Sequence, residues 1–222
     1  MGHHSEEHEL LPVRIIDNVE LSPGVFLISW KRTVSFIPGQ VVKIAANPEI
    51  PPRIYSICSG NRDDKMSILF DIKIDGYLTP KLAAAIPGNE LLVSKPYGSY
   101  TCDQKPAYWI ATGTGIAPFY SMFRSGLEGN KILIHGVRFL NQFFFEEEFE
   151  RNLGKNFIRC CSNERFAGVF NGRITDYISQ MKDLPRDFMY YLCGGGMMVI
   201  DVRDLLIEKG IPFGNILSEI YF

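Results

Sequence analysis

The sequence predicts two domains, an N-terminal antiparallel β-barrel over residues 9–101 and a C-terminal α/β domain with a doubly wound parallel sheet over residues 105–222. Two observations predict this division. Short β-type runs punctuated by glycine and proline fill the chain to about residue 100, whereas apolar strand-type runs alternate with longer helical patterns after it. The length of 222 residues allows two small domains that each bury a core.

Six β-type runs predict the strands of the first domain, separated by turn signals such as SPG, IPGQ and NRDD. They cover residues 13–21, 25–32, 40–46, 53–59, 66–74 and 89–96. Closely spaced runs of this kind indicate a small antiparallel barrel or sandwich. One helical pattern, TPKLAAAI, is predicted over residues 79–86, with Thr79 as N-cap and Pro80 at the first helical position.

Four strand–helix pairs and a last strand predict the second domain. The strands are expected at residues 107–113, 131–138, 156–162, 188–194 and 215–222. The helices are expected at residues 117–127, 141–153, 172–182 and 197–210. This alternation predicts a parallel sheet with right-handed crossovers. Ligands of such sheets bind beyond the carboxyl ends of the strands, at the switch point.

The composition is that of an ordinary globular protein, with 46% hydrophobic and 22% charged residues and a net charge of −2. A basic excess that would indicate nucleic acid or a membrane surface is absent, and no apolar run reaches the ~18 residues of a membrane span. The start, MGHHSEEHEL, lacks the apolar core of a signal peptide. We expect its His3, His4 and His8 to belong to a disordered tail rather than to a metal site.

The five cysteines are odd in number and scattered, and no C-x-x-C occurs. This usage predicts a reducing, cytoplasmic environment without a disulfide framework. It also excludes a cysteine-held iron–sulfur cluster within this chain.

The glycine-containing stretch ATGTGIAP, residues 111–118, joins the first predicted strand of the second domain to its helix. Glycines there let the backbone approach a ligand, and the helix start offers amides to a pyrophosphate. A lone G-x-G is also compatible with a tight turn, and Pro118 stands where the third glycine of G-x-G-x-x-G belongs. The next strand ends at Arg138 rather than at the acid that usually binds ribose.

Two further stretches contain residues that a core does not require. In PPRIYSICSG, the alternation of a strand places Arg53 and Tyr55 on one face and Ile54 and Ser56 on the other. In YYLCGGGMM, three glycines follow Cys193. The glycines form a flexible turn in the simplest interpretation, and they clear space for a planar group beside the thiol in the functional one.

The motifs RIYS, GYLT, GTGIAP, CGGGMM and the terminal EIYF occur in the order and spacing of the ferredoxin–NADP reductase superfamily. The sequence resembles this family from about Val13 to Phe222, most closely its bacterial ferredoxin/flavodoxin–NADP reductases. The stretches FDIKIDGYLTPKL and E-x-Y-aromatic are the most specific. The resemblance implies that the barrel binds FAD and that the α/β domain binds NADP(H).

The resemblance also implies a role for each matching residue on the flavin side. Arg53 would pair with the flavin phosphate, Tyr55 would lie against the isoalloxazine, and Ser56 would bond near flavin N5. The expected FAD-binding residues are Arg53, Tyr55, Ser56, Ile57, Ile72, Lys73, Ile74, Gly76, Leu78, Thr79 and Thr114. Tyr221 and Phe222 would stack on the flavin or its adenine, or else simply complete the last strand.

On the nicotinamide side, the resemblance implies that Cys193 packs near the nicotinamide C4 and that Glu219 stabilises charge or relays protons. Ser56, Cys193 and Glu219 are thus the expected catalytic residues, and no metal is expected. The expected NADP-binding residues are Thr114, Gly115, Arg138, Ser162, Asn163, Arg165, Arg173, Cys193, Gly194 and Met197. Asn163 replaces an arginine usual in NADP-specific relatives, and Glu164 would repel a 2′-phosphate.

The resemblance implies hydride transfer from NADPH to flavin N5, followed by single-electron transfer to a separate ferredoxin or flavodoxin. Such carriers are usually acidic, so a basic rim is expected, with Lys73, Lys81 and Lys95 as candidates. A monomer is expected. Three other functions stay open: an NADH-dependent reductase component of an oxygenase, a free-flavin or ferric reductase, and a non-catalytic flavin-binding electron-transfer subunit.

Overall fold

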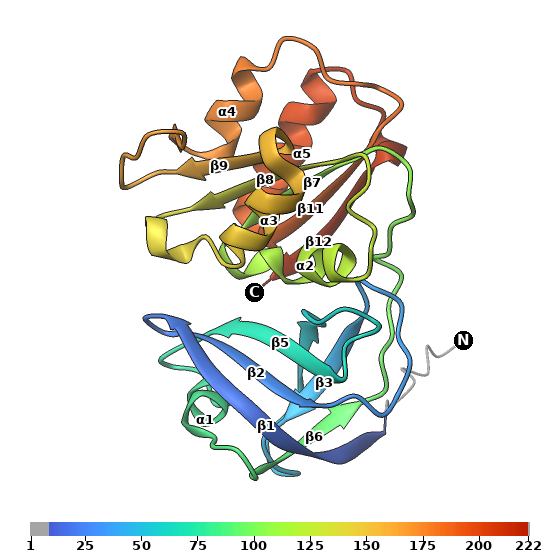
Figure 1. The fold of residues 1–222 in the computed structure, drawn as a ribbon, viewed down its shortest axis with the longest axis vertical. Helices are drawn as coiled ribbons and strands as arrows, with labels where there is room; N and C mark the ends of the chain where they lie inside the picture. The colour runs from blue at the N-terminus through green and yellow to red at the C-terminus, as the bar shows by residue number, and fades with distance from the viewer. Residues whose placement is uncertain (1–8, 222) are drawn as a thin grey trace, which may run out of the picture.

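The computed structural model describes residues 9–221 and has two domains, each built on a six-stranded sheet (Figure 1). The barrel lies below the α/β domain in this view, and β12 runs down to the junction between them. The predicted fold class is confirmed. The expectations for His3, His4, His8 and Phe222 fall outside the described residues.

The first sheet is antiparallel, with the strand order β4-β3-β6-β1-β2-β5. Its strands are β1 (Leu10–Ser22), β2 (Val25–Lys31), β3 (Val41–Ala45), β4 (Arg53–Ser56), β5 (Lys65–Asp71) and β6 (Glu90–Ser94). A bridge between Ile57 and Ile68 joins the two ends of this order. The amide of Cys58 donates to the carbonyl of Ser67 at 2.8 Å beside it. The sheet therefore closes into a barrel around an apolar core.

The helix of the barrel, α1 (Thr79–Ala84), differs from the prediction at both ends. Its N-cap is Leu78 rather than Thr79, because the Thr79 hydroxyl instead accepts a 2.8 Å hydrogen bond from the amide of Lys73. The helix ends two residues early, where Ala85 becomes extended and its carbonyl accepts a 2.7 Å hydrogen bond from Asn18 Nδ2. Strand β5 also ends early, at Asp71 instead of residue 74.

The second sheet is parallel, with the order β10-β9-β8-β7-β11-β12. Its strands are β7 (Ala107–Thr112), β8 (Lys131–Val137), β9 (Phe157–Cys161), β10 (Phe170–Asn171), β11 (Met189–Gly195) and β12 (Ile216–Tyr221). The helices are α2 (Ala117–Arg124), α3 (Glu146–Leu153), α4 (Ile174–Gln180) and α5 (Gly196–Glu208). Short 3₁₀ turns are η1 (Gly113–Ile116), η2 (Leu140–Gln142), η3 (Gly154–Asn156) and η4 (Phe213–Asn215). The two-residue β10 was not predicted.

Alternation along the buried strands divides the second domain into two apolar layers. Trp109 and Leu133 belong to the cluster that contains residues of α2 and α3, whereas Ile110 and Ile134 belong to the cluster that contains residues of α4 and α5. Helices therefore cover both faces, as a parallel sheet requires. Helix α2 lies along the underside of this domain, next to the barrel (Figure 1).

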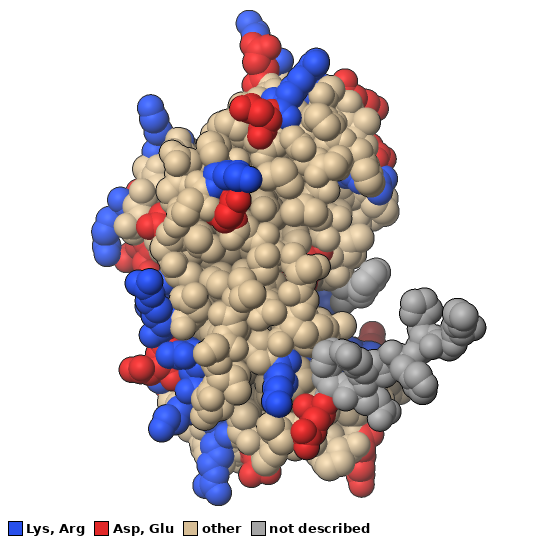
Figure 2. All heavy atoms as spheres, turned by 90° about the vertical axis from the view of Figure 1, so that its right-hand side faces the viewer, with Lys and Arg blue, Asp and Glu red and all other residues tan. Residues whose placement is uncertain are grey.

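The two domains share part of one core. Val25, Cys58 and Leu69 of the barrel are buried in the same cluster as Phe119 and Met122 of α2. On the face drawn in Figure 2, acidic and basic side chains are spread over both domains, and much of the surface between them carries neither. The junction is thus an apolar contact rather than a flexible link.

Candidate active site between the domains

The two glycine-containing turns lie side by side at the switch point of the parallel sheet. Strands β7 and β11 are neighbours and lead into η1 and into the glycines after Cys193. A Cβ atom on Gly115 would lie 2.4 Å from the carbonyl oxygen of Cys193. One on Gly194, whose φ is +148°, would lie 2.2 Å from Thr112 Oγ1. Glycine permits this contact because it carries no side chain.

Cys193 is not the last residue of its strand. Pairing with β12 continues through Gly194 and Gly195, so β11 ends two residues after Cys193 and one residue beyond the predicted end at residue 194. The same register places Cys193 opposite Glu219. The carboxyl ends of these two strands therefore carry a thiol and a carboxylate side by side.

A hydrogen bond joins this pair to the barrel. The Ser56 hydroxyl, at the end of β4, donates to Glu219 Oε2 at 2.8 Å across 163 positions of sequence. Burial raises the pKa of Glu219, and the hydrogen bond from Ser56 opposes that rise. The structure thus brings the three expected catalytic residues, Ser56, Cys193 and Glu219, to one place between the domains.

The thiol at this place is not poised as a nucleophile. Cys193 is fully buried, and burial, with the nearby charge of Glu219, holds its pKa well above the usual value. The half-buried ring of Tyr221 packs against the core cluster that contains Cys193. Burial also raises the pKa of Tyr221, with further contributions from Cys193 and Glu219. The Cys193 thiol and the Tyr221 phenol therefore stay protonated at neutral pH.

The face of β4 leads away from this cluster. Arg53 is exposed and Tyr55 is half-buried, with its ring edge-on to Phe70 at a centroid distance of 6.3 Å. Burial raises the pKa of the Tyr55 phenol and the charge of Arg53 lowers it. A cation and an aromatic face are thus presented next to Ser56, whose side chain is buried.

The loop after β5 contains both exposed and buried residues among those expected to bind FAD. Ile74 is 89% exposed, and the amide of Gly76 donates to the carbonyl of Lys73 at 2.8 Å to form a tight turn. The Lys73 ammonium pairs with Asp71 at 2.8 Å. The side chains of Ile57 and Leu78 belong to the barrel core, so only their backbone remains for a ligand.

A second group of expected residues lies at the ends of β8 and β9. The amides of Ser162 and Asn163 donate to the carbonyls of Val137 and Arg138, each at 3.1 Å. These hydrogen bonds bring Arg138, Ser162 and Asn163 together on an exposed edge. Arg173, at the start of α4, is also exposed, and its amide donates to Asp176 Oδ2 at 2.8 Å. Arg165 and Met197 are exposed.

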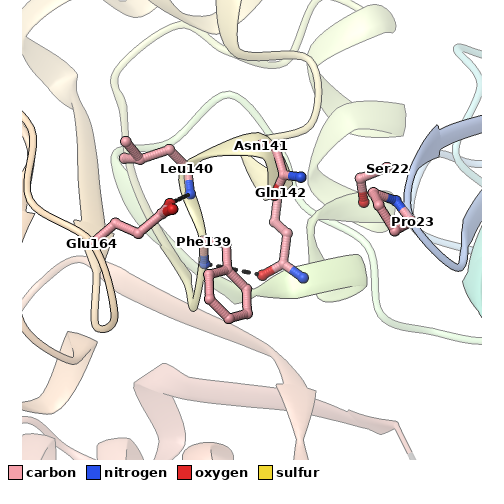
Figure 3. A pocket seen from close by; sticks show the side chains of 7 residues that line it. All are labelled: Ser22, Pro23, Phe139, Leu140, Asn141, Gln142 and Glu164. Atoms are coloured by element: carbon pink, nitrogen blue, oxygen red, sulfur yellow. Dashed lines mark hydrogen bonds between the residues drawn. The ribbon is translucent and has the colours of Figure 1, made fainter.

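An open pocket of about 530 Å³ lies beside this edge (Figure 3). Its lining residues are Ser22, Pro23, Phe139, Leu140, Asn141, Gln142 and Glu164. The carboxylate of Glu164 points at the loop after β8 and accepts a 2.5 Å hydrogen bond from the amide of Leu140 (Figure 3). Ser22 and Pro23 come from the barrel, so both domains contribute walls. The end of β8 could be predicted from the sequence, but nothing in the sequence indicated that the barrel would line this pocket.

Sequence reasoning missed His135, which is fully buried on β8. Its Nε2 lies 3.1 Å from the carbonyl oxygen of Gly113, and since a carbonyl only accepts, Nε2 carries the proton. Burial lowers the pKa of His135 to about 4. Its Nδ1 has no hydrogen-bond partner among residues 9–221. A neutral imidazole thus supports the turn η1, where Gly113 has a φ of +52°.

Within the described part of the chain, no cluster of three or more His, Cys, Asp or Glu side chains is arranged to hold a metal ion. Among those same residues, no helix is both long and apolar enough to cross a membrane.

The sequence of this chain is similar to those of known proteins. Residues 109–204 match the family of oxidoreductase NAD-binding domains. The chain is 36% identical over 230 residues to ferredoxin–NADP reductase of Pseudomonas aeruginosa, covering 87% of this chain and 88% of that protein. It is 26% identical to the electron transfer component of toluate 1,2-dioxygenase of Pseudomonas putida, covering 92% of this chain and 66% of that protein.

The fold resembles a solved ferredoxin–NADP⁺ reductase of Neisseria gonorrhoeae with bound FAD and NADP. The TM-score is 0.84 at 22% identity, and the match covers 97% of this chain and all of that one.

The buried imidazole predicts a specific dependence of stability on pH. The unfolded chain binds a proton at His135 below about pH 6.5, whereas the folded chain does not until about pH 4. The free energy of unfolding therefore falls as the pH falls from about 6.5 to about 4, because protonation of His135 favours the unfolded chain. This loss amounts to roughly 2 kcal/mol at pH 5. We expect His135→Gln, whose amide nitrogen still reaches Gly113, to lose about that much less stability than the wild type between pH 7 and pH 5.

Urea unfolding at both pH values measures this difference. His135→Asn is the matched control, because it also lacks the titration but its shorter amide mimics Nδ1 and cannot replace Nε2. It should be less stable than His135→Gln at both pH values. An unchanged pH dependence in His135→Gln would show that His135 is not held neutral.

Proposed function

This chain belongs to the ferredoxin–NADP reductase family of flavoprotein oxidoreductases, and from that premise we propose that it moves electrons between NADP(H) and a one-electron carrier protein. The carrier is a ferredoxin or a flavodoxin. The observation that carries the proposal is the Ser56–Glu219 hydrogen bond beside Cys193. It unites residues of both domains at the one place where a flavin on β4 and a nucleotide on β7 and β11 would meet.

The residues of the barrel fit FAD. An exposed guanidinium at Arg53 suits bidentate contact with a phosphate, and the half-buried ring of Tyr55 suits packing against a planar ring system. Ile72, Lys73, Ile74, Gly76 and Thr79 would contribute mainly through their backbone. Bound FAD would supply hydride acceptance followed by one-electron release.

The residues of the α/β domain fit NADP(H). The contact between Gly115 and the end of β11 leaves backbone, not side chains, at the switch point, where a pyrophosphate binds in such sheets. Arg138, Ser162 and Arg173 would contact the 2′-phosphate at the far edge. Arg165 is exposed nearby and would add charge rather than a fixed contact. Cys193, buried and protonated, would pack against the nicotinamide.

The residues between the two sites act by orientation and proton control. Ser56 holds the Glu219 carboxylate in one position through a 2.8 Å hydrogen bond. Burial raises the pKa of Glu219, which makes this carboxylate a better proton acceptor than a solvated one. The buried Cys193 side chain excludes water from the same place. Tyr221 would cover the site from the end of β12.

The partner surface is proposed from charge. Lys81 and Lys95 are exposed on the barrel and available to an acidic carrier, whereas Lys73 is partly neutralised by Asp71. Figure 2 shows basic side chains along one edge of the barrel, mixed with acidic ones. Such a rim would steer association more than it would add affinity. We expect the protein to act as a cytoplasmic monomer.

A second function, an NADH-dependent oxygenase reductase component, is favoured by two observations. One is the similarity to the electron transfer component of toluate 1,2-dioxygenase. The other is that Asn163 and Glu164 stand at the edge where a 2′-phosphate would need positive charge.

Steady-state kinetics test the proposed function. With ferricyanide as acceptor, we expect a larger kcat/KM for NADPH than for NADH, and then turnover with purified ferredoxins or flavodoxins. The flavin released by heat should elute as FAD in column chromatography. Equal use of NADH would favour the oxygenase reductase, and FMN as the only flavin would contradict the FAD assignment.

Glu219→Gln tests the proton-control role. The substitution keeps the size of the side chain but removes its charge, so FAD should stay bound. We expect turnover to fall by roughly ten- to a hundredfold, the low end of general acid–base contributions. Glu208→Gln, on the exposed face of α5, is the control and should leave turnover unchanged. Undiminished turnover of Glu219→Gln with both ferricyanide and the protein acceptor would contradict a proton-control role for Glu219.

Arg173→Ala tests the preference for NADPH. A charge-assisted hydrogen bond contributes about 1.5–3 kcal/mol, so the NADPH KM should rise by roughly tenfold or more while the NADH value stays nearly constant. Arg151→Ala, an exposed arginine on α3, is the matched control. A parallel rise for both nucleotides would mean that Arg173 does not read the 2′-phosphate.

A further inference from the structure

A short segment of the barrel, Ser59–Asp63, reaches across the junction and lies on α2. It begins three residues after Ser56 and continues the chain that leaves β4. The Ser121 hydroxyl of α2 donates to the carbonyl of Ser59 at 2.7 Å. The amide of Asn61 donates to Ser125 Oγ at 2.9 Å, just beyond the end of the helix. We call Ser59–Asp63 the clasp.

Gly60 makes the closest contact of the clasp. A Cβ atom on Gly60 would lie 2.7 Å from the carbonyl oxygen of Arg124 and 2.8 Å from its Cβ. These atoms belong to the backbone and the root of a side chain, so they cannot move aside without moving the helix. The separation between barrel and α2 is therefore set by the absence of a side chain at residue 60.

Two kinds of interaction, exposed ion pairs and a buried hydrogen bond, hold the clasp on α2. Arg124 pairs with Asp63 of the clasp at 3.0 Å and with Glu148 of α3 at 3.2 Å. All three side chains are partly exposed, so these pairs contribute little. Ser121 is fully buried and Ser59 nearly so. The buried hydrogen bond between them contributes more, because the hydroxyl and the carbonyl would have no water to replace it if it were broken.

The clasp and α2 connect the two sides of the proposed site. Its N-terminal side leads back to Tyr55 and Ser56, the flavin side of the proposed site. Helix α2 leads back from Ser121 to its start at Ala117 and then to η1 with Gly115, the nucleotide side. Hydride transfer needs reacting atoms about 3–3.5 Å apart, and a misplacement of about 1 Å costs roughly a hundredfold.

We propose that the clasp is a positioning element that sets the spacing between the flavin strand β4 and the nucleotide turn η1, with Gly60 and Ser121 as its positioning residues. The inference rests on the proposed function. The clasp is thus expected to affect the rate of hydride transfer and not the affinity for either nucleotide.

Gly60→Ala in the FAD-loaded protein tests this role. Stopped-flow bleaching of the bound flavin by saturating NADPH should slow by tenfold or more. FAD content, and the Kd of NADP⁺ from difference spectra, should stay within about twofold of the wild type. Gly214→Ala is the matched control, because a Cβ atom there meets nothing within 4 Å, and it should bleach at the wild-type rate.

Ser121→Ala is the second variant, for the case that Gly60→Ala does not fold. It removes the hydrogen bond to Ser59 without adding an atom, and we expect a smaller slowing of about threefold with unchanged Kd. Hydrogen exchange adds a readout that needs no activity: the amides of residues 59–63 and 121–125 should exchange faster in both variants, and those of β8 should not.

Wild-type bleaching in Gly60→Ala, or unchanged exchange in the clasp of both variants, would overturn the proposal. A weaker Kd for NADP⁺ with an unchanged bleaching rate would also overturn it, because the clasp would then support binding rather than spacing. If the wild type is bleached by neither NADPH nor NADH, the proposed function fails instead, and the exchange measurement still decides whether the clasp holds the two domains together.

Discussion

The packing of α2 between the parallel sheet and the barrel is the constraint on which the rest of the molecule depends. Phe119 stacks on Trp109 of β7 at a centroid distance of 5.7 Å, while Cys58 and Leu69 of the barrel belong to the same buried cluster. Each such side chain contributes about 1.5–3 kcal/mol by burial. Because only the short turn η1 separates α2 from β7, this packing turns the carboxyl ends of β7 and β11 toward the barrel. The site between the domains is a consequence of that orientation.

Once the strand ends face β4, the chemistry of the junction follows from burial. Ser56 reaches Glu219, and Glu219 lies opposite Cys193. Removal from water disfavours charge on each acidic group there, so the pKa values of Glu219, Cys193 and Tyr221 all rise. Burial thus makes the Glu219 carboxylate more basic, while its hydrogen bond from Ser56 fixes its position. The same groups on a solvated edge would have ordinary pKa values and no fixed geometry.

Local patterns predicted every strand except the two-residue β10, and most of the helices, because glycine–proline punctuation and alternating periodicity are encoded within a few residues. They also located the turns at Gly115 and Cys193 and the strand with Ser56. They did not reveal the closure of the barrel at Ile57 and Ile68, or the contact of Gly60 with α2, because these depend on residues far apart in the chain. His135 carried no signal either, since a lone histidine in an apolar run is ambiguous until its neighbours are known.

The two ends of the proposed nucleotide site are held in different ways. At the near end, Gly115 and Gly194 fit against backbone, and substitution there meets fixed atoms. At the far end, Arg138 and Asn163 are exposed, whereas the Glu164 carboxylate is held by the amide of Leu140. Nucleotide preference is a difference of affinities, and at this edge it depends on a few solvent-screened charges. The near end is therefore constrained by packing, while the far end can change its preference without disturbing the fold.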